Sequence, residues 1–125
     1  MRALFVDDEV EFLELMEKRL TRRGMEVVTA PDGQSALDLL DKARQSGEMF
    51  QIVVMDVRMP GMDGLETLRH MKEKAPSLPV ILLTGHACMG VAVQGLDLGA
   101  YDYMLKPVAI SELIIKMEEA ARSAV

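Results

Sequence analysis

The chain has 125 residues, 50% hydrophobic and 27% charged, which fits one globular domain with a core of its own. The net charge of -6 and the lack of a basic tract argue against a surface for nucleic acid or anionic membranes. One cysteine excludes an internal disulfide, there is no signal peptide, and no apolar run approaches the roughly 20 residues of a membrane span, so we expect a cytoplasmic protein.

Short apolar runs alternate with amphipathic stretches along the chain. Five runs are short and rich in β-branched or aromatic residues, which predicts strands at residues 4–6, 26–28, 52–55, 80–83 and 101–105. Apolar residues at helical spacing predict helices around residues 13–20, 36–40, 65–71, 91–98 and 113–117. Turn signals agree: Gly24 follows the first helix, residues 31–33 open the second, Asp63 and Glu66 form a capping pair, and Gly99 closes the fourth.

This alternation predicts an α/β fold: a doubly wound, five-stranded parallel sheet with helices on both faces. Five strand-helix units favour the flavodoxin-like strand order 2-1-3-4-5, in a single domain that spans residues 1–125. In that order a ligand crevice opens at the carboxyl ends of the first and third strands.

Polar residues stand at four of the five strand ends. The first strand runs into Asp7 and Asp8, the third into Asp56, the fourth into Thr84 and the fifth into Lys106. Taken singly, each has an ordinary interpretation: an acidic residue can cap the next helix, and a threonine or lysine can simply end a strand. Asp56 is harder to explain in that way, because it follows four apolar residues and a buried unpaired carboxylate is costly. Together they predict a ligand site.

Phosphoryl transfer to a carboxylate needs this set of residues. Close carboxylates repel by roughly 4 kcal/mol per pair at an effective dielectric near 20, so a hard divalent cation is expected among them. Mg²⁺ typically takes one or two carboxylates and keeps several waters, which suits Asp8 and Asp56. Asp56 would then be both ligand and nucleophile, with Lys106 and Thr84 stabilising the transferred group.

The chain resembles a response-regulator receiver domain, the phospho-acceptor of two-component signalling. The resemblance covers essentially the whole chain and rests on the segments VDDE, VVMDVRMPGMDG, ILLTGHA and GAYDYMLKP, in that order. It implies that Asp8, Asp56 and the backbone carbonyl of Arg58 bind Mg²⁺, with Asp7 nearby through water. It also implies that Asp56 takes a phosphoryl group from a phosphohistidine of a sensor histidine kinase or phosphotransfer protein.

The resemblance further implies a two-state switch. Lys106 would pair with the phosphoryl group, Thr84 would move to hydrogen-bond it, and Tyr103 would rotate into the vacated space. Tyr103 and Tyr101 share one face of their strand, so sheet packing is the alternative interpretation of Tyr103. A cis peptide bond between Lys106 and Pro107 would aim the lysine into the site, and the sequence leaves this open.

Some positions depart from the family pattern on its output side. The start of the fourth helix lacks the acidic and polar residues that are common there. Gly90 and Gly95 each weaken that helix by about 1 kcal/mol, and Ala109 stands where a cap worth about 1 kcal/mol is usual. We therefore hypothesise that the helix over residues 91–98, the strand at 101–105 and the last helix form a mobile face. This face would present Met89 and Val91 to an output domain or partner, or to a second copy in a homodimer. Looser packing with no partner role is the alternative.

Arg58 and His86 stand two residues beyond Asp56 and Thr84, where family members tune hydrolysis of the acyl phosphate. We expect a modest rate effect from Arg58 and give His86 less weight as a base or metal ligand, because Mg²⁺ prefers oxygen. Glu9 is interpreted as a first-turn acid of the first helix.

Three other functions compete with the switch as interpretations of this sequence. The acidic loop after the first strand disfavours an anion-binding cofactor site, and Arg58 stands where an aspartyl-phosphate phosphatase needs a second acid, so we expect a regulatory protein and not an enzyme. A receiver-like docking scaffold that does not turn over phosphate remains the alternative. The sequence leaves open whether the chain is a stand-alone regulator or a receiver from a longer protein.

Overall fold

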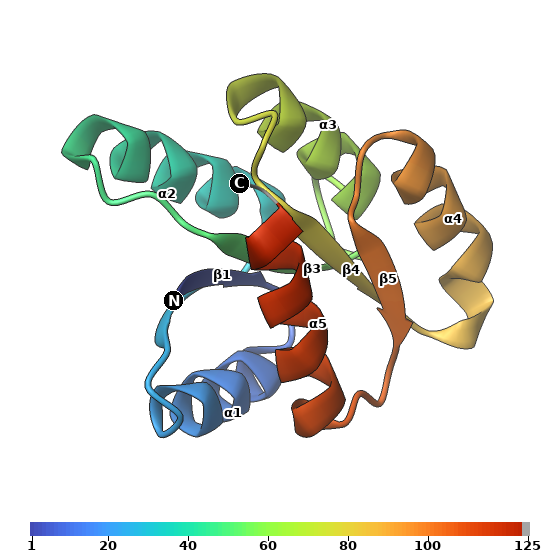
Figure 1. Cartoon of the computed structure of the whole chain (residues 1–125). Coiled ribbons are helices and arrows are strands. Elements are labelled where there is room, and N and C mark those ends of the chain that lie inside the picture. Colours follow the sequence, from blue (N-terminus) through green and yellow to red (C-terminus); the bar gives the residue numbers. More distant parts are fainter. Residues whose placement is uncertain (124–125) are drawn as a thin grey trace.

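The computed structural model describes residues 1–123, and these form a five-stranded sheet flanked by helices (Figure 1). In chain order the elements are β1 Arg2–Val6, α1 Val10–Thr21, β2 Glu26–Ala30, α2 Gly33–Ser46, β3 Ile52–Asp56, α3 Gly64–Lys74, β4 Val80–Thr84, a 3₁₀ turn His86–Cys88, α4 Met89–Asp97, β5 Asp102–Leu105 and α5 Ile110–Ser123. None of the helices among the described residues is long and apolar enough to cross a membrane.

The sheet is entirely parallel and has the order β2-β1-β3-β4-β5, which confirms the predicted topology. The three central strands are almost wholly apolar, and every residue of β3 and β4 is buried. The edge strands β2 and β5 are only partly covered. Continuous hydrophobicity in β3 and β4 follows from this arrangement, because helices cover both faces of a central parallel strand.

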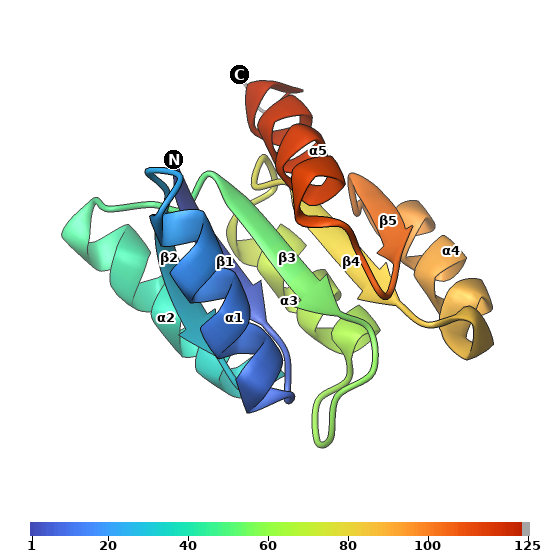
Figure 2. The same ribbon diagram turned by 90° about the horizontal axis from the view of Figure 1, so that it is seen from below.

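Two hydrophobic clusters lie on opposite faces of the sheet, and side chains alternate between them along each strand. Val53 and Met55 of β3 join the cluster formed with α2, α3 and α4. Ile52 and Val54 join the cluster formed with α1 and α5, and Figure 2 shows these two helices together on the near side of the sheet. The period of two along β3 therefore assigns each apolar residue to one layer.

The predicted helix boundaries depend on caps and glycines. The Asp32 side chain accepts a hydrogen bond from the Ser35 amide at 2.8 Å, and Asp63 accepts one from the Glu66 amide at 2.9 Å. Gly24, after α1, has a φ of 86°, in the left-handed region that glycine adopts at little cost. These contacts confirm that α2 and α3 begin at their aspartate signals.

The two glycines of α4 have different roles, which the sequence alone did not separate. A Cβ at Gly90 would meet no atom within 4 Å, so this glycine only weakens the helix. A Cβ at Gly95 would lie 2.3 Å from Leu82 Cδ1, so Gly95 lets α4 approach β4 closely. The interpretation of Gly95 as a weak point of the helix is therefore incomplete, because the same glycine permits close packing.

Candidate functional site

The predicted site residues meet at the carboxyl edge of the sheet. Asp7 follows β1, Asp56 ends β3, Thr84 ends β4 and Lys106 follows β5. Parallel pairing brings these ends level, since Asp56 is opposite Leu83 and Thr84 is opposite Leu105. Residues separated by up to 99 positions in the chain therefore share one site.

Three carboxylates gather there. Asp7, Asp8 and Asp56 each offer an oxygen, and these oxygens lie within 4.8 Å of one another. Asp7 is 1% exposed and Asp56 8% exposed, whereas Asp8 is open to solvent. Two buried carboxylates beside an exposed third fit a hard cation that keeps part of its water shell, which is the preference of Mg²⁺.

Lys106 neutralises part of this charge. Its Nζ donates to Asp7 Oδ2 at 2.7 Å and lies 3.4 Å from Asp56 Oδ2. The backbone N–H of Lys106 donates to the Thr84 carbonyl at 2.8 Å, which ties the end of β5 to the end of β4. The peptide bond between Lys106 and Pro107 is cis. The side chain of Lys106 is only 20% exposed, so its ion pairs are partly shielded from water.

The pKa values of Asp56 and Lys106 are both shifted from their ordinary values. Desolvation raises the pKa of Asp56, against the opposing effects of the Lys106 charge and of the Arg58 amide, which donates to Asp56 Oδ1 at 3.3 Å. Desolvation lowers the pKa of Lys106, but the hydrogen bond to Asp7 and the charges of Asp56 and Glu9 outweigh it, so the pKa is raised. Lys106 thus stays cationic. Further positive charge near Asp56 would stabilise its ionised carboxylate.

Glu9 takes part in the site, which the sequence did not indicate. It is the N-cap residue of α1 but makes no side-chain capping bond. Its amide donates to Asp7 Oδ1 at 2.9 Å, and its carboxylate lies 3.4 Å from Lys106 Nζ. The interpretation as a first-turn acid was therefore incomplete, because no local pattern reveals a partner that comes from the end of β5.

Thr84 ends β4 at the edge of the sheet that carries the carboxylates, and Tyr103 lies in β5 opposite Leu82. Thr84 is fully buried, and its hydroxyl donates to the Gly85 carbonyl at 3.0 Å. Tyr103 is partly buried and packs against the core cluster that contains α4, while Tyr101 is 37% exposed. Movement of either side chain remains a prediction.

Arg58 lies beside Asp56, to which its amide donates, and His86 begins the 3₁₀ turn after β4. Both residues are exposed, and Arg58 lines a hollow of about 480 Å³ between the loop after β3 and the start of α4. Val91 lines the same hollow and is 37% exposed, whereas Met89 is partly buried. His86 is not one of the residues that form the acidic cluster within the described part of the chain.

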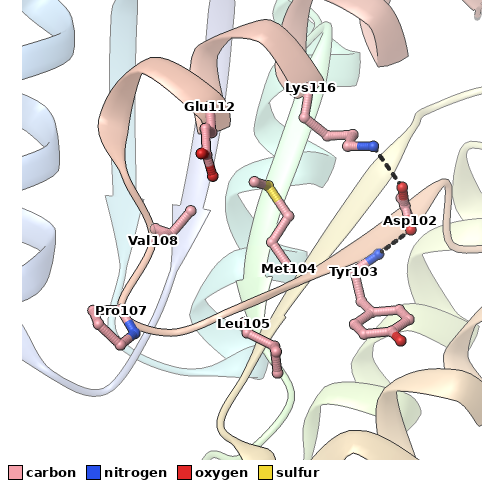
Figure 3. Close-up of a pocket in the computed structure, with 8 residues that line it drawn as sticks. All are labelled: Asp102, Tyr103, Met104, Leu105, Pro107, Val108, Glu112 and Lys116. Atoms are coloured by element: carbon pink, nitrogen blue, oxygen red, sulfur yellow. Dashed lines mark hydrogen bonds and ion pairs between the residues drawn. The ribbon is translucent and has the colours of Figure 1, made fainter.

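A groove of about 600 Å³ follows β5 on the expected output face (Figure 3). Asp102 and Lys116 form an ion pair at 2.7 Å across it, and the Asp102 carboxylate also accepts from the Tyr103 amide at 2.8 Å. Figure 3 shows Met104 pointing toward α5 and the Tyr103 ring pointing away from it. The Asp102–Lys116 ion pair thus links β5 to α5 within the expected output face.

The fold and the acidic cluster at its carboxyl edge define the class of receiver domains. The family model described as the response regulator receiver domain matches residues 3–118. The chain belongs to this family, whose general function is that of a regulatory phosphorylation switch in two-component systems.

Relatives and solved structures agree with this assignment. The chain is 37% identical over 122 residues to the transcriptional regulatory protein TctD of Salmonella typhimurium, covering 98% of this chain and 52% of TctD. It is 38% identical to the response regulator MprA of Mycolicibacterium vanbaalenii, covering 98% of this chain and 51% of MprA. The chain thus spans about half the length of these relatives.

Among solved structures, a response regulator receiver domain protein from Clostridium thermocellum matches with a TM-score of 0.89 at 30% identity, over 98% of this chain and 94% of that one. The receiver domain of NtrX from Brucella abortus matches with a TM-score of 0.87 at 34% identity, over 97% and 98%. Receiver domains of this family interact with histidine kinases and output domains.

Proposed function

We propose that the chain is a phosphorylation-activated switch in which Asp56 accepts a phosphoryl group from a phosphohistidine of a sensor histidine kinase or phosphotransfer protein. One observation carries this proposal: the Asp56 carboxylate lies 3.4 Å from Lys106 Nζ and within 4.8 Å of the Asp7 and Asp8 carboxylates. A nucleophilic carboxylate, a cation and a set of metal-binding oxygens therefore meet at one point.

The transfer needs little from the protein beyond position and charge. An Asp56 oxygen bonds to phosphorus while the bond between phosphorus and the donor imidazole nitrogen breaks, and that electron pair stays on the imidazole. The product is an acyl phosphate. Lys106, 3.4 Å from Asp56 Oδ2, would pair with the transferred oxygens. The Thr84 hydroxyl, which donates to the Gly85 carbonyl, would move to donate to them.

The donor set fits Mg²⁺. Asp8, Asp56 and the backbone carbonyl of Arg58 would hold the ion directly, and Asp7 would hold it through water. When bound, Mg²⁺ supplies positive charge to the oxygens of the phosphoryl group. Support comes from the buried position of Asp7 and Asp56 beside the exposed Asp8.

The response to phosphorylation would pass through Lys106, Thr84 and Tyr103 to the surface of α4, β5 and α5. That surface would contact an output domain or partner, or a second copy of the chain. Arg58 and His86 would tune hydrolysis of the acyl phosphate. Exposed apolar residues on α4 and just before β5 support this assignment of the surface: Val91, Val93, Leu96 and Tyr101.

Acetyl phosphate with Mg²⁺ tests the proposal directly. We expect one labile phosphoryl adduct by intact mass in the wild type and none in Asp56→Asn. Asp63→Asn is the matched control, because an asparagine at this helix cap still accepts the Glu66 amide and the adduct should persist. Absence of the adduct in the wild type would favour a docking scaffold that does not turn over phosphate.

A further inference from the structure

An aromatic ring contributes to the environment of Lys106. The Nζ atom of Lys106 lies 4.6 Å from the centroid of the Phe12 ring. Phe12 stands on the first turns of α1, whereas Lys106 follows β5, so the contact joins the first helix to the last strand. Phe12 is partly buried and packs against the core cluster that contains α1 and α5.

The distance is short enough for a cation–π interaction. The face of an aromatic ring is electronegative, and a cation within about 6 Å of the centroid is attracted to it. Lys106 is 20% exposed, so water screens this attraction less than it would at an open surface. The ring also takes the place of solvent beside the ammonium, in the groove that Phe12 and Lys106 line together.

Within residues 1–123, the other partners of the Lys106 ammonium are carboxylates. Nζ lies 2.7 Å from Asp7, 3.4 Å from Asp56 and 3.4 Å from Glu9. These hydrogen bonds have a preferred direction and must exchange when a new set of phosphoryl oxygens forms on Asp56. Attraction to a ring face tolerates a small sideways shift of the cation. A ring face can therefore keep its contact with an ammonium whose oxygen partners change.

We propose that Phe12 is a positioning residue that holds the Lys106 ammonium beside Asp56 through its ring face. This inference rests on the proposed function of Asp56 and Lys106 and adds a residue that acts through the lysine. The effect belongs to the phosphoryl-transfer step itself. It should therefore be seen with a small phosphodonor and with no partner protein present.

The experiment compares Phe12→Leu with Phe12→Tyr. Leucine keeps an apolar side chain but has no ring, whereas tyrosine keeps the ring face. Leu15→Ala is the control, because Leu15 lines the same groove on α1 but is neither charged nor aromatic. The first readout is the rate of adduct formation with acetyl phosphate and Mg²⁺. The second is the proton chemical shift of the Lys106 ε-methylene, measured without metal or donor. The ring current of Phe12 moves this signal upfield when the methylene lies over the ring.

We expect Phe12→Leu to slow adduct formation about three- to twentyfold, as the energies of cation–π contacts imply. Phe12→Tyr should stay within about twofold of the wild type by the same reasoning, as should Leu15→Ala. The upfield shift should be present in the wild type and in Phe12→Tyr and absent in Phe12→Leu. Equilibrium unfolding of each variant identifies any loss of fold.

Several results would overturn the inference: an unchanged rate in Phe12→Leu, an equal loss in Phe12→Tyr, or no upfield shift in the wild type. A wild-type chain that forms no adduct would instead refute the proposed function. In that case the chemical shift would still report whether Lys106 lies over the Phe12 ring, so the two failures are distinguishable.

Discussion

The shortest ion pair of Lys106 is to Asp7, at 2.7 Å, and its distance to Asp56 is longer, at 3.4 Å. Asp7 is 1% exposed, so this carboxylate is held away from water with the lysine as its cationic partner. The lysine charge therefore lies closer to Asp7, at the end of β1, than to the proposed acceptor Asp56. A phosphoryl group on Asp56 would compete with Asp7 for the same ammonium.

Replacing Lys106 should destabilise the metal-free chain. In Lys106→Met, Asp7 and Asp56 lose their cation, and we expect the metal-free chain to lose about 1–3 kcal/mol of unfolding free energy, less than a fully buried pair would. Urea unfolding in a chelator measures the loss, and added Mg²⁺ should recover part of it. Lys116→Met is the control, since its more exposed pair with Asp102 should contribute about 1 kcal/mol or less. Equal losses in both variants would contradict the assignment.

Asp56 should destabilise the metal-free chain at neutral pH. Burial raises the pKa of Asp56 above its ordinary value of 3.8, so the folded state binds this proton more readily than the unfolded state. The resulting loss of stability begins as pH rises past the ordinary value and is complete above the raised pKa.

Asp56→Asn should therefore raise the unfolding free energy of the metal-free chain at pH 7 relative to the wild type. The gain should shrink as pH falls through that window, because the wild-type carboxyl is then neutral as well. Unfolding measured across the pH range in a chelator tests this. A gain that persisted unchanged at low pH would point to a cause other than ionisation.

Mg²⁺ should stabilise the chain through Asp8. Ligand binding to the folded state adds about 2.7 kcal/mol when its concentration is a hundredfold above the dissociation constant. We expect a rise in Tm with added Mg²⁺ in the wild type and little rise in Asp8→Asn. Glu11→Gln, which removes the charge of an exposed acid on α1, should respond as the wild type does. The same rise in all three proteins would exclude Asp8 as a ligand.

The two glycines of α4 should respond in opposite directions to alanine. Gly90→Ala should stabilise the chain by about 0.5–1 kcal/mol, because the site has open space and alanine favours the helix. Gly95→Ala should destabilise it by about 1–3 kcal/mol, because the new Cβ would meet Leu82. Urea unfolding compares the pair. A stabilising effect at both positions would contradict the close packing of α4 on β4.

Hydrogen exchange tests the proposed mobile face. Residues 86–98 should gain amide protection when a phosphoryl mimic is bound at Asp56, because ordering of the α4 region would slow local opening. Amides of β1 and β3, which are buried in the sheet, serve as the internal reference. Equal protection of residues 86–98 in both states would leave looser packing as the explanation of the weak α4 sequence.

Much of the fold could be predicted because its signals are local. The apolar run of β3 and the aspartates that begin α2 and α3 each act within a few residues, and the structure confirms them. The strand order also followed, because alternating strands and helices leave few parallel arrangements with right-handed crossovers. Gly95 shows the limit of local evidence, since a glycine that weakens a helix and one that permits close packing look alike in sequence.

By itself the sequence determined which residue types stand at the strand ends, and therefore that Asp7, Asp56, Thr84 and Lys106 would share one edge of the sheet. Only the tertiary structure decided how Lys106 divides its contacts among Asp7, Asp56 and Glu9, and that the Phe12 ring lies beside it. The physical reason is that a strand period sets the direction of a side chain, whereas its partners depend on how α1 and the end of β5 pack together. Ion pairs between residues far apart in the chain leave no signal in the local sequence pattern.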